Sequence, residues 1–246
     1  MSPDMAPRPF VPRESHALTN ANHNGDNEAL WERTRRAQER LPASPLNDGL
    51  FKGREIIHRD SRIAGGVCLG ANGREAVVVD WRQKASPGTT TCLDALYTIA
   101  VERATLDGRF RRSRALQAVY ETIDEHFIDR TPSAVERVNH RVGAGTDDKV
   151  HIDCYIAART GVCRHMALAC AAILERMVDE GLLRGKVSHD RNSIAGQGAH
   201  AWCRYTSSNG SIAILDAMQR FFGTLEKSKE VGMWDYSRPE ERASAA

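Results

Sequence analysis

Apolar side chains recur at helical spacing between residues 163 and 180. They form one stripe, made of Ala167, Cys170, Ala171, Leu174, Met177 and Val178. Spacings of three and four residues are typical of an amphipathic helix packed on a core. Gly181 follows directly, and glycine commonly ends helices. The pattern therefore predicts a long helix that begins at Cys163.

A second periodicity follows, with residues 199–205 alternating and rich in aromatic side chains, and 211–216 forming a short apolar run. The residues between them, Ser207-Ser208-Asn209-Gly210, are typical of a turn. This predicts a β-hairpin with His200 near its start and Asp216 at its end. Because the two ends of an antiparallel hairpin lie side by side, we expect these residues to meet. Trp202 is expected to face the other side of its strand and to join the core.

The remaining pattern is predominantly helical, with a small β region before it. Helices are predicted over residues 91–106, 113–127 and 131–142, and short strands over 55–58, 66–70 and 75–81, with a hairpin turn at Asn72-Gly73. Residues 187–199 lack periodicity and contain Gly196 and Gly198, which predicts a loop, either an ordinary connection or a mobile lip.

Composition limits the classes of function. The chain has 246 residues, 41% hydrophobic and 27% charged, enough for one sizeable core. A net charge of +2, with basic and acidic residues mixed, predicts no nucleic-acid partner, and the basic run 109–114 is expected to be a solvated loop and helix start. No run approaches the ~18 apolar residues of a membrane span, so no membrane partner is predicted. The oligomeric state is open.

The expected location is the cytoplasm, because the chain shows no apolar leader and its six cysteines show no paired spacing typical of a disulfide framework or zinc knuckle. The alternative is delivery out of the cell by a route that needs no signal peptide. The first residues, rich in proline and asparagine, fit that alternative, but they fit any unstructured terminus equally well.

Cys163 is the candidate nucleophile. A cysteine in the first turn of a helix feels the positive end of the helix dipole and faces free N–H groups, which lower the thiol pKa. His200 is the candidate base, and Asp216 is placed to fix the tautomer of that imidazole and to stabilise its charged form. His165 is expected to be structural, because two positions along a helix point apart.

A zinc site is the rival chemical interpretation. Its ligands would come from Cys154, Cys163, His165, Cys170, His200 and Cys203. Their spacing matches no known zinc motif, and Cys163 and Cys170 would lie two helical turns apart. We therefore predict neither a metal nor an organic cofactor.

Three short motifs together resemble the transglutaminase-like superfamily of papain-fold cysteine enzymes. They are Gly161-Val162-Cys163 before a helix of small residues, His200-Ala201-Trp202 on a strand, and Leu215-Asp216 on the next. The order of cysteine, histidine and aspartate matches that family over roughly residues 116–222. One departure is Ala217, where the family usually has proline. The resemblance implies an α+β fold, with the helix of the nucleophile packed on an antiparallel sheet.

The resemblance also implies acyl transfer through a thioester on Cys163, with a protein, peptide or small amide as substrate. Hydrolysis by a peptidase or amidase is favoured, because water needs no second binding site. A transglutaminase or amide-forming acyltransferase would use the same three residues, and a non-catalytic binding module or a secreted effector enzyme are further alternatives. The oxyanion would need a side-chain donor besides the N–H of Cys163, and Tyr155, Gln197 and Asn139 are candidates.

Four segments are expected along the chain. Residues 1–27 lack periodicity and are expected to be disordered, and 28–112 hold a helix over 27–40, the small β region and a further helix, all of uncertain attachment. Residues 113–228 would form the transglutaminase-like core. Residues 229–246 are expected to be a loose tail, with Trp234 and Tyr236 as candidates for docking on the body.

Overall fold

The structure is a computed structural model that describes residues 50–70, 76–81, 90–144, 149–194, 197–232 and 234–243. The segment expected to be disordered, the helix expected over 27–40 and the turn at Asn72-Gly73 lie outside these residues. Within them, helices and several β-sheets share one core, so the expected α+β class is confirmed. None of the described helices is both long and apolar enough to pass through a lipid bilayer.

The principal sheet has four antiparallel strands in the order β11-β10-β9-β8. The strands are β8 (Gly185–Ile194), β9 (Gly198–Ser207), β10 (Ile212–Asp216) and β11 (Phe221–Thr224). β9 and β10 form the expected hairpin, with Leu215 opposite Cys203. Its turn is closed by the N–H of Gly210, which donates to Ser207.

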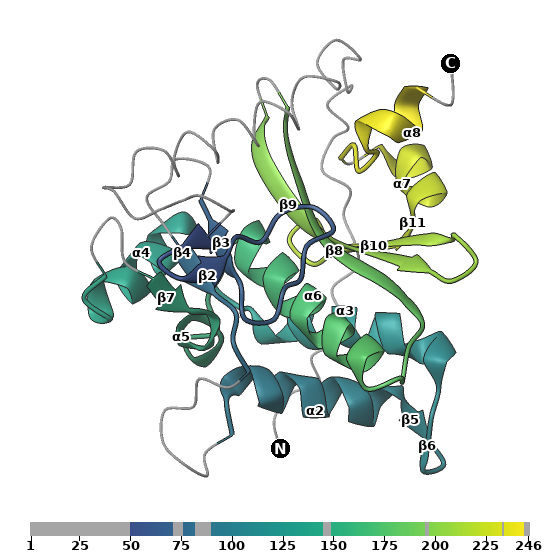
Figure 1. Ribbon diagram of the computed structural model, residues 1–246, viewed down its shortest axis with the longest axis horizontal. Coiled ribbons are helices and arrows are strands. Elements are labelled where there is room, and N and C mark those ends of the chain that lie inside the picture. The colour runs from purple at the N-terminus through teal and green to yellow at the C-terminus, as the bar shows by residue number, and fades with distance from the viewer. Residues whose placement is uncertain are drawn as a thin grey trace, which may run out of the picture.

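Helix α6 (Cys163–Asp179) crosses one face of this sheet, as its apolar stripe predicts. Cys203, Tyr205 and Leu215 point from the sheet into the core that α6 shares. Two further helices, α2 (Cys92–Ala104) and α3 (Arg112–His126), pack on α6, and Figure 1 shows them along its length. The small residues of α6 allow these neighbours to approach closely, so the helix is almost entirely buried.

Three shorter helices are α4 (Pro132–Arg141), α5 (Ile152–Ala157) and α7 (Leu225–Val231). α5 packs on α6 and α4 packs on α5, whereas α7 packs on β10 and β11. α4 begins where proline is tolerated, in the first turn, and the Thr131 hydroxyl accepts from the N–H of Ala134. The predicted helices over 91–106, 113–127 and 131–142 are thus confirmed.

The small β region lies beside α6 and β8, where Arg191 donates to the carbonyl of Leu69 at 2.7 Å. A three-stranded sheet has the order β3-β4-β7, and two short hairpins complete the β structure. The sheet consists of β3 (Val67–Leu69), β4 (Ala76–Val78) and β7 (Lys149–His151); the hairpins are β1 (Leu50–Phe51) with β2 (Arg54–Glu55), and β5 (Thr105–Leu106) with β6 (Arg109–Phe110). Glu175 of α6 accepts from the N–H groups of Ile63 and Ala64, at 2.9 and 2.7 Å, and so ties this region to the helix.

The prediction of a loop over residues 187–199 is wrong. Residues 185–194 form β8, which pairs with β9 along its whole length. The strand is polar on both faces, including Ser188, Asp190 and Asn192 on one of them. The strand therefore shows no alternation of apolar and polar residues. Its buried polar side chains are instead paired with polar groups of another segment.

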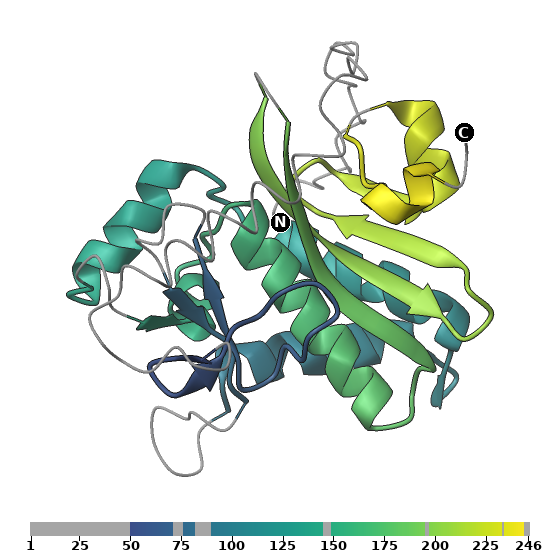
Figure 2. The ribbon, with the colours of Figure 1, turned by 45° about the horizontal axis from the view of Figure 1, so that its top comes forward.

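That other segment is the supposed loose tail. Residues 234–243, which we call the C-terminal strap, run across the face of the sheet opposite α6 and end in α8 (Pro239–Ala243). Trp234 and Tyr236 are buried with Trp202 and Ile214 of the sheet. Figure 2 shows α6 on one side of the sheet and the C-terminal helices on the other. The expected loose tail is therefore wrong for these residues, and docking of Trp234 and Tyr236 is confirmed.

One buried histidine of β8 makes the fold sensitive to acid. Burial, and then the charges of Arg191 and Arg164, lower the pKa of His189 from 6.5 to about 3. Below pH 6.5 the unfolded chain takes up a proton on this residue that the folded chain refuses, so the folded state loses stability as the pH falls. As the pH falls below 6.5, we expect the free energy of unfolding of the wild type to decrease more steeply than that of His189→Leu. The difference in slope should be up to about 1.4 kcal/mol per pH unit.

Denaturant titrations of both proteins at a series of pH values below 6.5 would measure this difference. Parallel curves for the two proteins would contradict the assigned ionisation of His189. Above that pH the group is neutral in both states, so the difference between the proteins should be constant there.

Candidate active site

The loop before α6 is held in a conformation that only a few sequences permit. Arg159 has a positive φ of 53°, and the N–H of Gly161 donates to the carbonyl of Asp129 at 3.1 Å. A Cβ on Gly161 would lie 2.7 Å from the Phe127 ring and 2.8 Å from Cβ of His165. Glycine is therefore required there by close approach, and it sets the direction in which the chain enters α6.

His165 supports the start of the helix from inside. Its Nδ1 accepts from the N–H of Val162 at 3.3 Å, and its ring packs on Tyr155 with centroids 4.1 Å apart. The side chain is fully buried. The structural role expected for His165 is thus confirmed, and the first turn of α6 is built on it.

His200 and Asp216 meet as the hairpin predicts. Nε2 of His200 lies 2.5 Å from Oδ2 of Asp216, and both side chains are almost completely withdrawn from water. The contact joins the start of β9 to the last residue of β10. Because Asp216 occupies Nε2, the ring presents Nδ1 to its other neighbour, Cys163.

Cys163 is the first residue of α6, and its thiol lies close enough to His200 and to the backbone N–H of Ala201 for both to lower its pKa. Removal from water would raise the pKa of Cys163, but the hydrogen bond and charge of His200, aided by Ala201, lower it below 9.0. Burial would likewise lower the pKa of His200, but the charge and hydrogen bond of Asp216, aided by Cys163, raise it above 6.5. The two shifts together favour a thiolate–imidazolium pair at neutral pH.

The carboxylate of Asp216 is held by two further donors. The hydroxyl of Tyr236 donates to Oδ2 at 2.7 Å, and the N–H of Gln219 donates to Oδ1 at 3.0 Å. The next residue is fixed as well, because Arg130 donates to the carbonyl of Ala217 at 2.7 Å. This last bond holds the chain where the resembled family usually has proline.

Tyr236 is the site residue that sequence reasoning missed. The only sequence signal for it was a pair of aromatic residues, Trp234 and Tyr236, in a charged tail. This pair indicated that the tail docks on the body of the protein but not on which surface. The ring of Trp234 meets the ring of His200 at 4.9 Å. The strap thus reaches both the imidazole and the carboxylate.

The expected orientation of Trp202 is wrong. His200 and Trp202 are two residues apart on β9, and such residues lie on the same face of a strand. Their ring centroids are 6.2 Å apart, and Trp202 packs at 5.1 Å on Tyr236. Trp202 is a core residue, but its core lies under the strap, not under α6.

The other residues of the proposed zinc set do not gather around Cys163. Within the described ranges, no three or more histidine, cysteine or acidic side chains lie close enough to hold a metal ion. Burial raises the pKa of Cys154, Cys170 and Cys203, which is the opposite of the shift at Cys163. Cys163 therefore differs chemically from these thiols.

The candidate oxyanion donors differ in availability. Tyr155 is fully buried and donates its hydroxyl hydrogen to Oδ1 of Asn139 at 2.6 Å, so it is committed elsewhere. Asn139 is partly exposed, and Gln197 is exposed in the turn before β9. The N–H of Cys163 lies in the first turn of α6, where no intrahelical acceptor exists, and is the donor closest to the thiol along the chain.

A cavity of about 950 Å³ lies at the other end of α6. Its lining includes Arg54, Asp80, Trp81 and Glu175. None of the three candidate catalytic residues lines it, so we assign it no part in their chemistry.

Comparison of the chain with protein-family models, with curated proteins and with solved structures finds no match. The interpretation of the site therefore rests on its own geometry and on the chemistry of its residues.

Selective alkylation would test the lowered pKa of Cys163. Cys92 and Cys154 are also partly exposed, but removal from water and the charge of Asp153 raise their pKa values. Each unit of pKa changes the thiolate fraction about tenfold. We expect iodoacetamide at neutral pH to modify Cys163 at least about tenfold faster than either, as measured by mass spectrometry of the peptides.

His200→Ala provides the control for this measurement. Removing the imidazole should raise the pKa of Cys163 and slow its alkylation toward the rates of Cys92 and Cys154. Equal rates at all three cysteines in the wild-type protein would show that the thiol and the imidazole are not paired in the resting state.

A second prediction concerns Gly161. In Gly161→Ala the new Cβ must displace Phe127 or His165, and overpacking of this kind costs about 1–3 kcal/mol. Because His165 builds the start of α6, we expect slower alkylation of Cys163 as well as a lower free energy of unfolding.

Gly185→Ala is the matched variant, since its Cβ would lie 2.4 Å from the carbonyl of Thr206, at the end of β8 and β9 away from His200. It should lower stability and leave the alkylation rate unchanged. If both variants slow alkylation equally, the loop before α6 has no special role.

Proposed function

We propose that the chain is a cysteine-dependent acyl-transfer enzyme that acts on an amide through a thioester, with water as the favoured acceptor. The observation that carries this proposal is the contact series from Cys163 through His200 to Asp216, in which the pKa of the thiol is lowered and that of the imidazole is raised. A buried imidazole between a thiol and a carboxylate is the arrangement that nucleophilic catalysis by cysteine requires.

The proposed reaction begins with the Cys163 thiolate, which attacks the carbonyl carbon of the amide. The carbon–nitrogen bond then breaks, and the His200 imidazolium gives its proton to the leaving amine. In the second half, His200 takes a proton from water, the resulting hydroxide equivalent attacks the thioester, and the carbon–sulfur bond breaks. The products are a carboxylic acid and the restored thiolate–imidazolium pair.

Asp216 makes no bond to substrate in this scheme. It holds the ring through Nε2, so that Nδ1 carries the proton that moves. It also stabilises the positive charge that His200 bears while the thiol is ionised. The partial exposure of Cys163 beside a buried His200 supports access of a substrate to Cys163.

The fold supports the more specific proposal of a papain-like, transglutaminase-like core. The nucleophile begins a buried helix, and the helix packs on an antiparallel sheet. His200 and Asp216 lie on two adjacent strands of that sheet. This is the arrangement that the resemblance implies. We propose accordingly that protein, peptide or small amide groups are the substrates.

Mass spectrometry of the intact protein tests the proposal directly. Incubation with a panel of small carboxamides and peptides should add the mass of the acyl group to wild-type protein. Cys163→Ser, which is close in size, should form no such adduct on this timescale, because an alcohol at this site is far less acidic than a thiol.

A primary amine added to the same incubation identifies the acceptor. If water is the acceptor, the free acid is released at an unchanged rate; if an amine is preferred, the product is a new amide, and the enzyme is a transglutaminase or acyltransferase. An unmodified Cys163 with every amide, despite fast alkylation by iodoacetamide, would support a non-catalytic binding module instead.

A further inference from the structure

The C-terminal strap contacts the candidate site as well as the sheet. The hydroxyl of Tyr236 and Nε2 of His200 share one oxygen of Asp216, at 2.7 and 2.5 Å. Burial, followed by the charge and hydrogen bond of Asp216, raises the pKa of Tyr236 well above 10.0, so its hydroxyl remains a donor. We infer that Tyr236 is a positioning residue, which the strap delivers to Asp216 so that the thiol–imidazole pair can form.

Tyr236 itself is held rigidly. Its ring stacks on Phe221 at 5.5 Å and meets the edge of Trp202 at 5.1 Å, and the side chain is 1% exposed. A donor fixed on two neighbours loses little freedom when it binds the carboxylate. The hydroxyl therefore restricts the carboxylate plane, and with it the direction in which His200 points.

Polar contacts fix the strap on either side of Tyr236. On one side, Trp234 donates from Nε1 to Asn192 at 2.7 Å, and Asn192 donates to the carbonyl of Asp235 at 2.8 Å. Asn192 lies directly opposite His200 in the sheet. The first anchor is thus one strand away from the imidazole.

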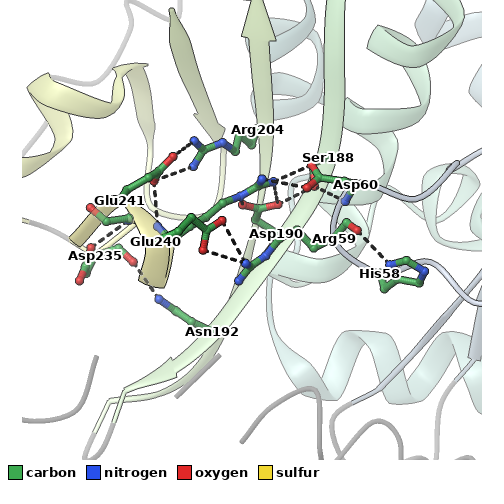
Figure 3. A network of polar contacts seen from close by, with 12 residues as sticks. His58, Arg59, Asp60, Ser188, Asp190, Asn192, Arg204, Asp235, Glu240 and Glu241 are labelled. Atoms are coloured by element: carbon green, nitrogen blue, oxygen red, sulfur yellow. Dashed lines mark hydrogen bonds and ion pairs between the residues drawn. The ribbon is translucent and has the colours of Figure 1, made fainter. Parts of the chain in front are cut away.

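On the other side, Arg238 binds two carboxylates at once. It donates to Asp190 of β8 and to Asp60 of the loop before β3, with distances of 2.8 to 2.9 Å. Glu241 accepts from the buried Arg204 of β9, as Figure 3 shows. These charge-assisted bonds explain why β8 carries polar residues on a buried face, because they are the partners of the strap.

This inference rests on the proposed function, but its test reads the thiol and not turnover. The measurement is the rate at which iodoacetamide modifies Cys163 at neutral pH. In Tyr236→Phe the ring and its packing remain, and only the hydroxyl is lost. We expect alkylation of Cys163 to slow by about three- to tenfold, the effect of losing one ordinary hydrogen bond.

Tyr205→Phe is the matched control. Tyr205 also lies on the principal sheet, is also buried, and donates its hydroxyl to the carbonyl of Arg184 at 2.8 Å, away from the site. This variant should alkylate at the wild-type rate. Thermal unfolding of both variants checks that each is folded at the temperature of the assay.

An Asp216→Ala background separates positioning from general packing. If Tyr236 acts through Asp216, Tyr236→Phe should slow alkylation in the wild-type background and have no further effect once the carboxylate is gone. The same loss in both backgrounds, or no loss in either, would overturn the inference.

The two proposals fail in distinguishable ways. A Tyr236 effect on alkylation without any acyl adduct would leave the positioning role standing and remove the enzymatic function. If acyl adducts form equally well in Tyr236→Phe and its alkylation rate is unchanged, the enzymatic function stands and the positioning role of Tyr236 is overturned.

Discussion

The hydrogen bond between His200 and Asp216 is the contact on which the surrounding structure depends. A carboxylate and an imidazole withdrawn from water can keep their charges only when the remaining lone pairs and protons are satisfied. Asp216 obtains its donors from three separate parts of the chain: β9, the turn after β10, and the strap. Sheet, turn and strap must therefore be in place together, and the arrangement tolerates little disorder in any of them.

Local periodicity was enough to predict the parts of the site that lie inside regular elements. The stripe that begins after Cys163 and the hairpin between His200 and Asp216 are properties of neighbouring residues, and both are found where the sequence places them. Their meeting was predictable too, because hairpin geometry joins the two ends and a helix packed on the sheet brings its first residue to the same edge.

The missed parts depend on contacts between distant residues. β8 has no apolar alternation because Asp190 and Asn192 are matched by Arg238 and by the Trp234–Asp235 segment, which lie more than forty positions later in the chain. The strap has no periodicity for the same reason, since its few aromatic residues fill gaps on a sheet whose presence a short window does not show. The predicted orientation of Trp202 was wrong because the residue lies two positions from His200, and residues two apart on a strand share a face.

The position of Tyr236 in the chain has a consequence for the order of events during synthesis. Translation delivers α6, then the sheet, and only afterwards the strap, because that is their order along the chain. A nascent chain thus carries its nucleophile and base before the donor that aligns them has emerged. In the scheme proposed above, a chain whose strap has not yet docked lacks the hydrogen bond from Tyr236 to Asp216, so full reactivity of the thiol would follow only once the strap lies on the sheet.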